Sequence, residues 1–127
     1  IKAEEDISAI RTSVKRVVAL LNFSPVNQTK IVTAASELAR NTLEHGEGGH
    51  VVIQILDDGN RIGVGLIFED EGPGISDIEQ AMEDGFSTGK GMGLGLSGTK
   101  RLMDEFSIAQ KNGCGLKVSI TKWQEKA

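Results

Sequence analysis

The sequence contains a single cysteine, no long apolar run and no excess of basic side chains. Cys114 alone cannot form an internal disulfide, so the cysteine content gives no sign of an oxidising compartment. No stretch of about 18 apolar residues occurs, and no charged segment leads into an apolar one. We therefore expect neither a membrane-spanning helix nor export, and we predict a cytoplasmic protein.

The balance of charge is acidic. Eighteen Asp and Glu side chains against fourteen Lys and Arg give a formal net charge of −4. Without a general basic field, the chain is expected to bind neither nucleic acid nor an anionic membrane, and any anionic ligand must be held by local features. The length predicts one domain, residues 1–127, that buries roughly two-thirds of the surface exposed by the unfolded chain.

Apolar periodicity predicts two helices in the first third of the chain. Apolar side chains recur at helical spacing from Ile7 to Leu21, with Asp6 as the expected N-cap. A second helix is expected to start after Asn27 and to end near Gly46. Its inward-facing residues are predicted to be Ile31, Ala34, Ala35 and Leu38.

Alternating apolar residues predict two pairs of antiparallel strands. The predicted strands cover residues 51–56, 62–68, 106–109 and 116–121. Tight turns are expected at 57–60 and at 112–113, where Gly and Asn supply positive φ angles. Between the pairs lies a glycine-rich stretch, mostly loop, with helices expected near 77–82 and over 97–104. This order predicts an α+β fold, a two-layer α/β sandwich with a mixed, mostly antiparallel sheet and helices on one face.

Asp70 follows the second predicted strand in phase with its inward-facing residues. Because side chains alternate across a strand, Asp70 shares the parity of Leu66 and Phe68 and its carboxylate is aimed inward. A buried carboxylate needs a donor, such as a backbone N–H, a cation or the amino group of a base. An isolated Asp at a strand end more often caps a turn. The nearby Gly72 and Gly74 permit close approach of the backbone to a flat ligand, which favours a binding site.

Glu37 and Asn41 form a second polar group, on the second predicted helix. Their i, i+4 spacing places both side chains on one face. An Asn oxygen is a suitable ligand for Mg²⁺, which keeps several waters, and a Glu one turn away could accept a proton from an attacking hydroxyl. The alternative is an ordinary solvated helical face.

Glycine alternates with other residues in Gly89-Lys90-Gly91-Met92-Gly93-Leu94-Gly95, just before the third predicted helix. Such backbone N–H groups can converge on phosphate oxygens, the helix N-terminus adds its positive dipole end, and Lys90 could supply charge. The segment is neither a P-loop, because Gly91 replaces the Mg²⁺-binding Ser or Thr, nor a dinucleotide fingerprint, because no βαβ unit surrounds it. Taken alone, it could be a flexible loop.

Three weak motifs in register resemble the N, G1 and G2 boxes of the GHKL ATPase superfamily. They are Glu37-Leu38-Ala39-Arg40-Asn41, Asp70-Glu71-Gly72-Pro73-Gly74 and Gly91-Met92-Gly93-Leu94-Gly95. The resemblance covers nearly the whole chain and implies a Bergerat-type sandwich. The short length and the segment Glu83-Asp84-Gly85-Phe86-Ser87-Thr88 make the chain similar to the anti-sigma-factor serine/threonine kinases, above all to the RsbT-type switch kinases of the stressosome.

The resemblance implies ATP and Mg²⁺ as cofactors and assigns a role to each motif. Glu37 is implied as the catalytic base acting on a substrate hydroxyl, Asn41 as the Mg²⁺ ligand, and Asp70 as the acceptor for the adenine amino group. The other implied nucleotide-binding residues are Gly72, Gly74, Ile75, Lys90, Gly91, Gly93, Leu94 and Gly95. Many relatives carry Thr where this chain has Leu116, which places the water-mediated part of adenine recognition in question.

The implied activity is phosphorylation of a STAS-domain anti-sigma-factor antagonist in a partner-switching pathway. An alternative is a nucleotide-gated binding module that sequesters a sigma factor or activates a phosphatase without phosphotransfer. A third is the catalytic fragment of a histidine kinase, which is less favoured because 127 residues are expected to leave no room for a dimerising helical hairpin with a phosphoacceptor His. Cys114 is interpreted as a turn residue rather than a nucleophile.

Overall fold

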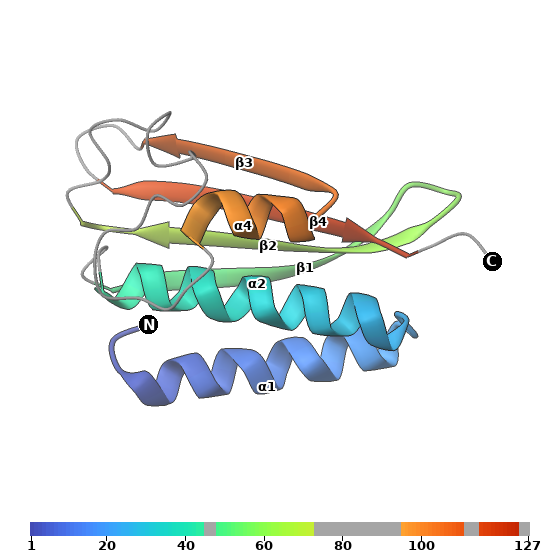
Figure 1. Ribbon diagram of the computed structural model, residues 1–127, viewed down its shortest axis with the longest axis horizontal. Helices are drawn as coiled ribbons and strands as arrows, with labels where there is room; N and C mark the ends of the chain where they lie inside the picture. The colour runs from blue at the N-terminus through green and yellow to red at the C-terminus, as the bar shows by residue number, and fades with distance from the viewer. Residues whose placement is uncertain (45–47, 73–94, 111–114, 125–127) are drawn as a thin grey trace.

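The computed structural model describes residues 1–44, 48–72, 95–110 and 115–124. Three helices and four strands follow one another within these residues (Figure 1). In chain order they are α1 (Glu4–Leu20), α2 (Pro25–Glu44), β1 (Gly49–Asp57), β2 (Ile62–Asp70), α4 (Gly95–Leu102), β3 (Glu105–Gln110) and β4 (Leu116–Trp123). The order of these elements confirms the sequence prediction. The expected helix near 77–82 and the turn at 112–113 lie outside the described residues.

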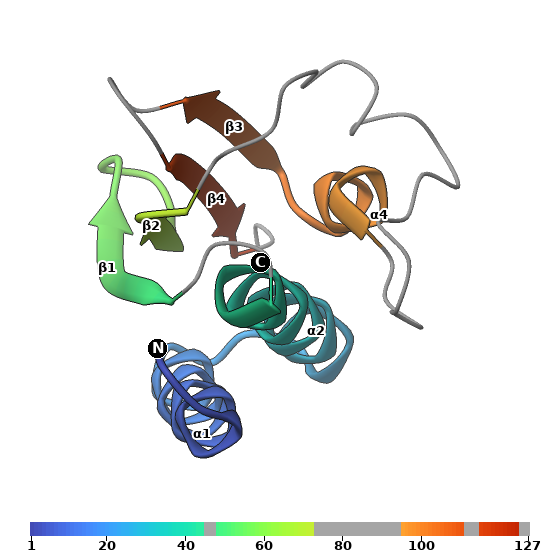
Figure 2. The same ribbon diagram turned by 90° about the vertical axis from the view of Figure 1, so that its left-hand side faces the viewer.

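The four strands form one sheet in the order β1-β2-β4-β3. Every strand pair in the described chain is antiparallel, so the sheet there is not mixed as the sequence analysis allowed. In the register, Gly49 faces Asp70 and Phe68 faces Val118. Figure 2 shows the helices on one side of the sheet, with α2 between α1 and α4. The predicted α+β sandwich is therefore confirmed.

The core fills the space between α2 and the sheet. The four residues predicted to face inward from α2 are all buried, with Ile31, Ala34 and Ala35 fully excluded from solvent. Val64 and Leu66 of β2 are equally buried and belong to the same apolar cluster. The small side chains of the alanines let α2 lie close to the sheet, and this close packing sets the distance between the other α2 side chains and the strands.

The predicted helix starts were wrong. Asp6 is not an N-cap, because α1 begins after Ala3 and the Asp6 carboxylate accepts hydrogen bonds from the backbone N–H groups of Lys2 (2.7 Å) and Ala3 (3.1 Å). These two bonds, first Lys2 and then Ala3, lower the pKa of Asp6 from its ordinary value. The second helix begins at Pro25 rather than after Asn27. Proline suits a first helical position because its missing N–H would have no helical partner there.

The start of α2 is also capped. The Ser24 hydroxyl accepts a hydrogen bond from the Asn27 N–H at 3.2 Å. The third helix begins at Gly95 rather than Ser97 and ends at Leu102. Within the described segments, no helix has the length and apolar content needed to cross a membrane.

Candidate functional site

The described residues of the predicted nucleotide site come from element ends that lie at one end of the molecule. Figure 1 shows the C-terminal end of α2, the end of β2, the start of α4 and the start of β4 at the same, left-hand end of the molecule. Asp70 is the last residue of β2, Gly95 is the first of α4 and Leu116 is the first of β4. The fold thus gathers three segments that are far apart in the sequence.

Asp70 is buried, with 8% of its surface exposed. Its Oδ1 accepts hydrogen bonds from the backbone N–H groups of Gly72 at 3.1 Å and Leu116 at 3.0 Å. The inward direction predicted for this carboxylate, and its need for donors, are both confirmed. The bond to Gly72 is the local turn that an isolated Asp would make, whereas the bond to Leu116 spans 46 positions of the chain.

The second oxygen of Asp70 is the one that can serve a ligand. Within the described chain Oδ2 accepts no hydrogen bond, while both bonds to Oδ1 fix the plane of the carboxylate. A fixed acceptor on a buried residue beside a glycine suits the amino group of a planar base. Oδ2 is therefore an acceptor that fits the adenine amino group.

Leu116 is a site residue whose contribution the sequence analysis missed. The sequence analysis considered only the side chain of Leu116, whereas in the structure its backbone N–H donates a hydrogen bond to Asp70. The preceding Gly115 has a φ of +91°, which glycine adopts without strain. A glycine directly before a predicted strand is the sequence signal that could have drawn attention to the amide at 116.

Glu37 and Asn41 lie one turn apart on α2 and are both partly exposed. Neither makes a hydrogen bond to a described residue, whereas their neighbour Thr42 is buried and donates to the Leu38 carbonyl at 2.9 Å. Arg40 on the same helix binds Glu4 at 3.2 Å, and this bond raises the pKa of its guanidinium. The two side chains are accessible, and their roles as base and metal ligand stay predictions.

Part of the phosphate-binding motif falls within the described chain. α4 begins at Gly95, so its N-terminus, where backbone N–H groups lack helical partners, lies at the same end of the sheet as Asp70. α4 contacts α2 directly. The remaining predicted nucleotide-binding residues, Gly74, Ile75, Lys90, Gly91, Gly93 and Leu94, lie outside the described residues.

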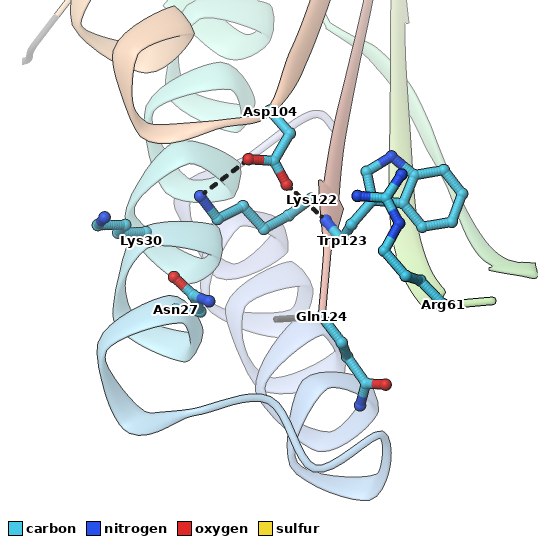
Figure 3. Close-up of a pocket in the computed structure, with 7 residues that line it drawn as sticks. All are labelled: Asn27, Lys30, Arg61, Asp104, Lys122, Trp123 and Gln124. Atoms are coloured by element: carbon cyan, nitrogen blue, oxygen red, sulfur yellow. Dashed lines mark hydrogen bonds and ion pairs between the residues drawn. The ribbon is translucent and has the colours of Figure 1, made fainter. Parts of the chain in front are cut away.

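A hollow of about 320 Å³ lies at the opposite end of the molecule. No sequence prediction pointed to it. Figure 3 shows its lining, which comes from the start of α2, the start of β2, the connection between α4 and β3, and the end of β4. The lining residues are Asn27, Lys30, Arg61, Asp104, Lys122, Trp123 and Gln124. This hollow is separate from the Asp70 site.

Comparison with known proteins places the chain in a family. Residues 26–126 match the family described as histidine kinase-, DNA gyrase B-, and HSP90-like ATPase. The chain is 46% identical over 123 residues to the serine/threonine-protein kinase RsbT of Bacillus subtilis (strain 168), with 97% of this chain and 92% of that protein covered. It is 34% identical over 122 residues to the anti-sigma F factor of Thermoanaerobacter sp. (strain X514), with 91% and 84% covered.

Solved structures agree at the level of the fold. The catalytic domain of histidine kinase ThkA superposes with a TM-score of 0.59 at 18% sequence identity, covering 98% of this chain and 93% of that domain. The buried Asp70 at the end of β2 and the N-terminus of α4 lie at the same end of this fold. The chain belongs to the histidine kinase-, DNA gyrase B- and HSP90-like ATPase family and, within it, to the serine/threonine kinases of the anti-sigma-factor type.

Proposed function

We propose that the chain uses ATP and Mg²⁺ to phosphorylate a serine or threonine of a STAS-domain anti-sigma-factor antagonist. The observation that carries the nucleotide part is the Asp70 carboxylate, which is buried and fixed by two backbone N–H groups with one oxygen left over. The kinase part is supported by the likeness to RsbT over nearly the whole chain. The same proposal assigns residues 1–127 to one kinase domain in the cytoplasm, where ATP is available.

In this proposal each described residue has a limited task. Asp70 accepts a hydrogen bond from the adenine amino group and so orients the base. Gly72 lies beside Asp70 and has no side chain that would obstruct the base. Asn41 offers one amide oxygen to Mg²⁺, which suits an ion that retains water ligands. The N-terminus of α4 stabilises phosphate charge. When bound, ATP would supply the phosphoryl group and Mg²⁺ would offset the negative charge on it.

Glu37 is proposed to take the proton from the substrate hydroxyl as the oxygen attacks. Glu37 lies one turn before Asn41 on the same face of α2, so one rigid helix carries both the proposed base and the proposed metal ligand. Within the described chain Glu37 makes no hydrogen bond, so its carboxylate stays available as an acceptor. Phosphoryl transfer relies mainly on positioning and charge neutralisation, so one base on a rigid helix is sufficient.

A second candidate function needs the same pocket but no transfer. Relatives carry the name anti-sigma F factor, and this name favours a module that binds a sigma factor under control of nucleotide. Activation of a phosphatase is a variant of the same idea. Both functions predict ATP binding that depends on Asp70, and they differ only in whether Glu37 is needed for the output.

The deciding experiment measures transfer of labelled γ-phosphate from Mg·ATP to a purified STAS-domain antagonist. Glu37→Gln is expected to abolish transfer while ATP binding, measured by calorimetry, remains. Glu44→Gln is the matched control, because Glu44 is an exposed residue of the same helix that makes a long surface ion pair of 3.7 Å with Arg40. Tight ATP binding without any label on the antagonist would contradict the kinase and favour the binding module.

A further inference from the structure

Gly49, the first residue of β1, lies opposite Asp70, the last residue of β2. This position has no room for a side chain. A Cβ atom placed on Gly49 would overlap the carbonyl oxygen of Glu69 and would lie 2.9 Å from the Cα of Asp70. Both are backbone atoms, which cannot turn aside as the end of a flexible side chain can. The absence of a side chain at Gly49 therefore lets the two strand ends approach closely.

The hydrogen bonds of Gly49 explain why this approach is so close. Its N–H donates to the carbonyl of Ile1 at 3.2 Å, and its own carbonyl accepts a hydrogen bond from the N-terminal ammonium of Ile1. The backbone polar groups of Gly49 are thus directed away from β2. Gly49 and Asp70 therefore form a non-hydrogen-bonded antiparallel pair, the kind in which the two Cα atoms are closer, about 4.5 Å apart.

The start of β1 is anchored and cannot easily move away from β2. The preceding residue, Gly48, is buried, and its N–H donates to the backbone carbonyl of Thr42 at 2.9 Å. Thr42 is itself buried near the end of α2, where its hydroxyl donates to the Leu38 carbonyl. A side chain at Gly49 would therefore displace the end of β2 rather than the start of β1.

The end of β2 carries the carboxylate of the nucleotide site. Because β2 lies between β1 and β4 in the sheet, Asp70 has Gly49 on one side and Leu116 on the other. A shift of the Asp70 backbone away from β1 would alter the 3.0 Å bond between Oδ1 and the Leu116 N–H. Since this bond helps to fix the plane of the carboxylate, Oδ2 would move as well.

We propose that Gly49 is a positioning residue of the nucleotide site. Its missing side chain lets β1 hold the end of β2 at the place where Oδ2 of Asp70 accepts a hydrogen bond from the adenine amino group. The inference rests on the adenine role proposed for Asp70. Gly49 acts only through Asp70, so its replacement should affect the recognition of the base rather than binding in general.

The first test compares proton–nitrogen NMR spectra of the nucleotide-free wild type and Gly49→Ala. The amide signals of Gly72 and Leu116, whose N–H groups bind Asp70, are expected to shift. Gly65→Ala is the matched control, because Gly65 lies in β2 and a Cβ there would meet the end of the Leu56 side chain, at 3.3 Å, as its nearest neighbour. The same two signals should stay in place in Gly65→Ala.

Calorimetry then measures nucleotide binding. Gly49→Ala is expected to bind ATP about tenfold more weakly than the wild type. ITP has a carbonyl in place of the amino group, so its affinity should fall less and the preference for ATP should decrease. In the Asp70→Asn background, Gly49→Ala should change ATP affinity by less than about twofold, because the acceptor that it positions is already lost. A glycine needed only for folding would weaken both nucleotides alike in both backgrounds.

A thermal melt without nucleotide checks that Gly49→Ala folds. Gly49 is the first residue of a strand at the edge of the sheet, so one added methyl group there should leave the core folded. The wild type gives a test that does not depend on this variant. The close pair predicts a strong nuclear Overhauser effect between the α-protons of Gly49 and Asp70, and its absence would overturn the inference.

Two results with a folded Gly49→Ala protein would also overturn the inference. One is unchanged amide signals of Gly72 and Leu116. The other is a loss of ATP affinity that is equally large with Asp70 and with Asn at that position. Shifted amide signals together with unchanged ATP affinity would support the positioning of Asp70 and contradict its adenine role, so this inference and the proposed function fail separately.

Discussion

Replacement of Asp70 by Asn tests the nucleotide site with almost no change in shape. Oδ1 accepts from the N–H groups of Gly72 and Leu116, and these two donors force the Asn side chain to place its oxygen in the same position. Its NH₂ group then occupies the position of Oδ2. Loss of charge assistance in the two retained bonds costs about 1 kcal/mol of folding stability. The protein should therefore still fold.

The effect on ATP binding is expected to be much larger. In the proposed site, the adenine amino group would meet a second donor in place of the charged acceptor that Asp70 offers. Loss of that bond together with an unpaired donor costs about 3 to 4 kcal/mol, which weakens ATP binding by roughly a few hundredfold. ITP offers a carbonyl in place of the amino group, so the preference of the wild type for ATP over ITP should shrink or reverse in Asp70→Asn.

Isothermal titration calorimetry with ATP and with ITP measures both effects, and a thermal melt confirms the fold. Asp104→Asn is the matched control, because that carboxylate also accepts from a backbone N–H but lies at the other end of the sheet. Its ATP affinity should equal that of the wild type. ATP binding by Asp70→Asn within about threefold of the wild type would refute the role assigned to Asp70.

Three further predictions follow from single contacts. Leu116→Pro removes the N–H that holds Asp70 and should weaken ATP binding at least about tenfold in calorimetry, whereas Leu116→Ala should bind nearly as the wild type. Leu38→Ala should lower the free energy of unfolding in urea by about 2 to 5 kcal/mol, because Leu38 is only 2% exposed; a loss below about 1 kcal/mol would contradict this packing. Asp6→Asn should destabilise the protein at neutral pH, because the folded-state pKa of Asp6 is lowered. That contribution is present above the unfolded-state pKa of 3.8 and is lost as the pH falls through the lower folded value, so urea titrations of the two proteins should converge only in strong acid.

The order and type of the described elements could be predicted because they depend on local periodicity. Apolar residues at period 3.6 and period two identified α1, α2 and all four strands, and the turn after Asp57 was correctly placed. The expectation that Asn60 also has a positive φ was wrong, because in this turn only Gly59 has one, at +90°. The helix starts could not be predicted as well. An Asp at the start of a helix can be the N-cap, or it can lie in the first turn with its side chain reaching back to the backbone before the helix, as Asp6 does. The sequence does not distinguish these two roles.

The candidate site was predicted in outline from motifs and one parity argument. The inward direction of Asp70 is confirmed, and so is the family. The roles of Glu37 and Asn41 stay predictions, because both side chains are accessible on α2 without a described partner that would fix their function. The same holds for the assignment of residues 1–127 to one domain. The contribution of the Leu116 backbone was missed, since every residue except proline has an N–H and the sequence does not single one out.

The sequence by itself determined that Asp70 faces inward, because alternation of side chains is a property of any extended backbone. Only the tertiary structure decided that its donor is Leu116, since this bond joins residues 46 positions apart and depends on β4 pairing with β2. The hollow at the other end of the sheet likewise exists only in three dimensions. Its cations Lys30, Arg61 and Lys122 have unremarkable sequence neighbours and come together because strand order and helix packing, which are set by long-range burial, bring three separate segments to one end of the sheet.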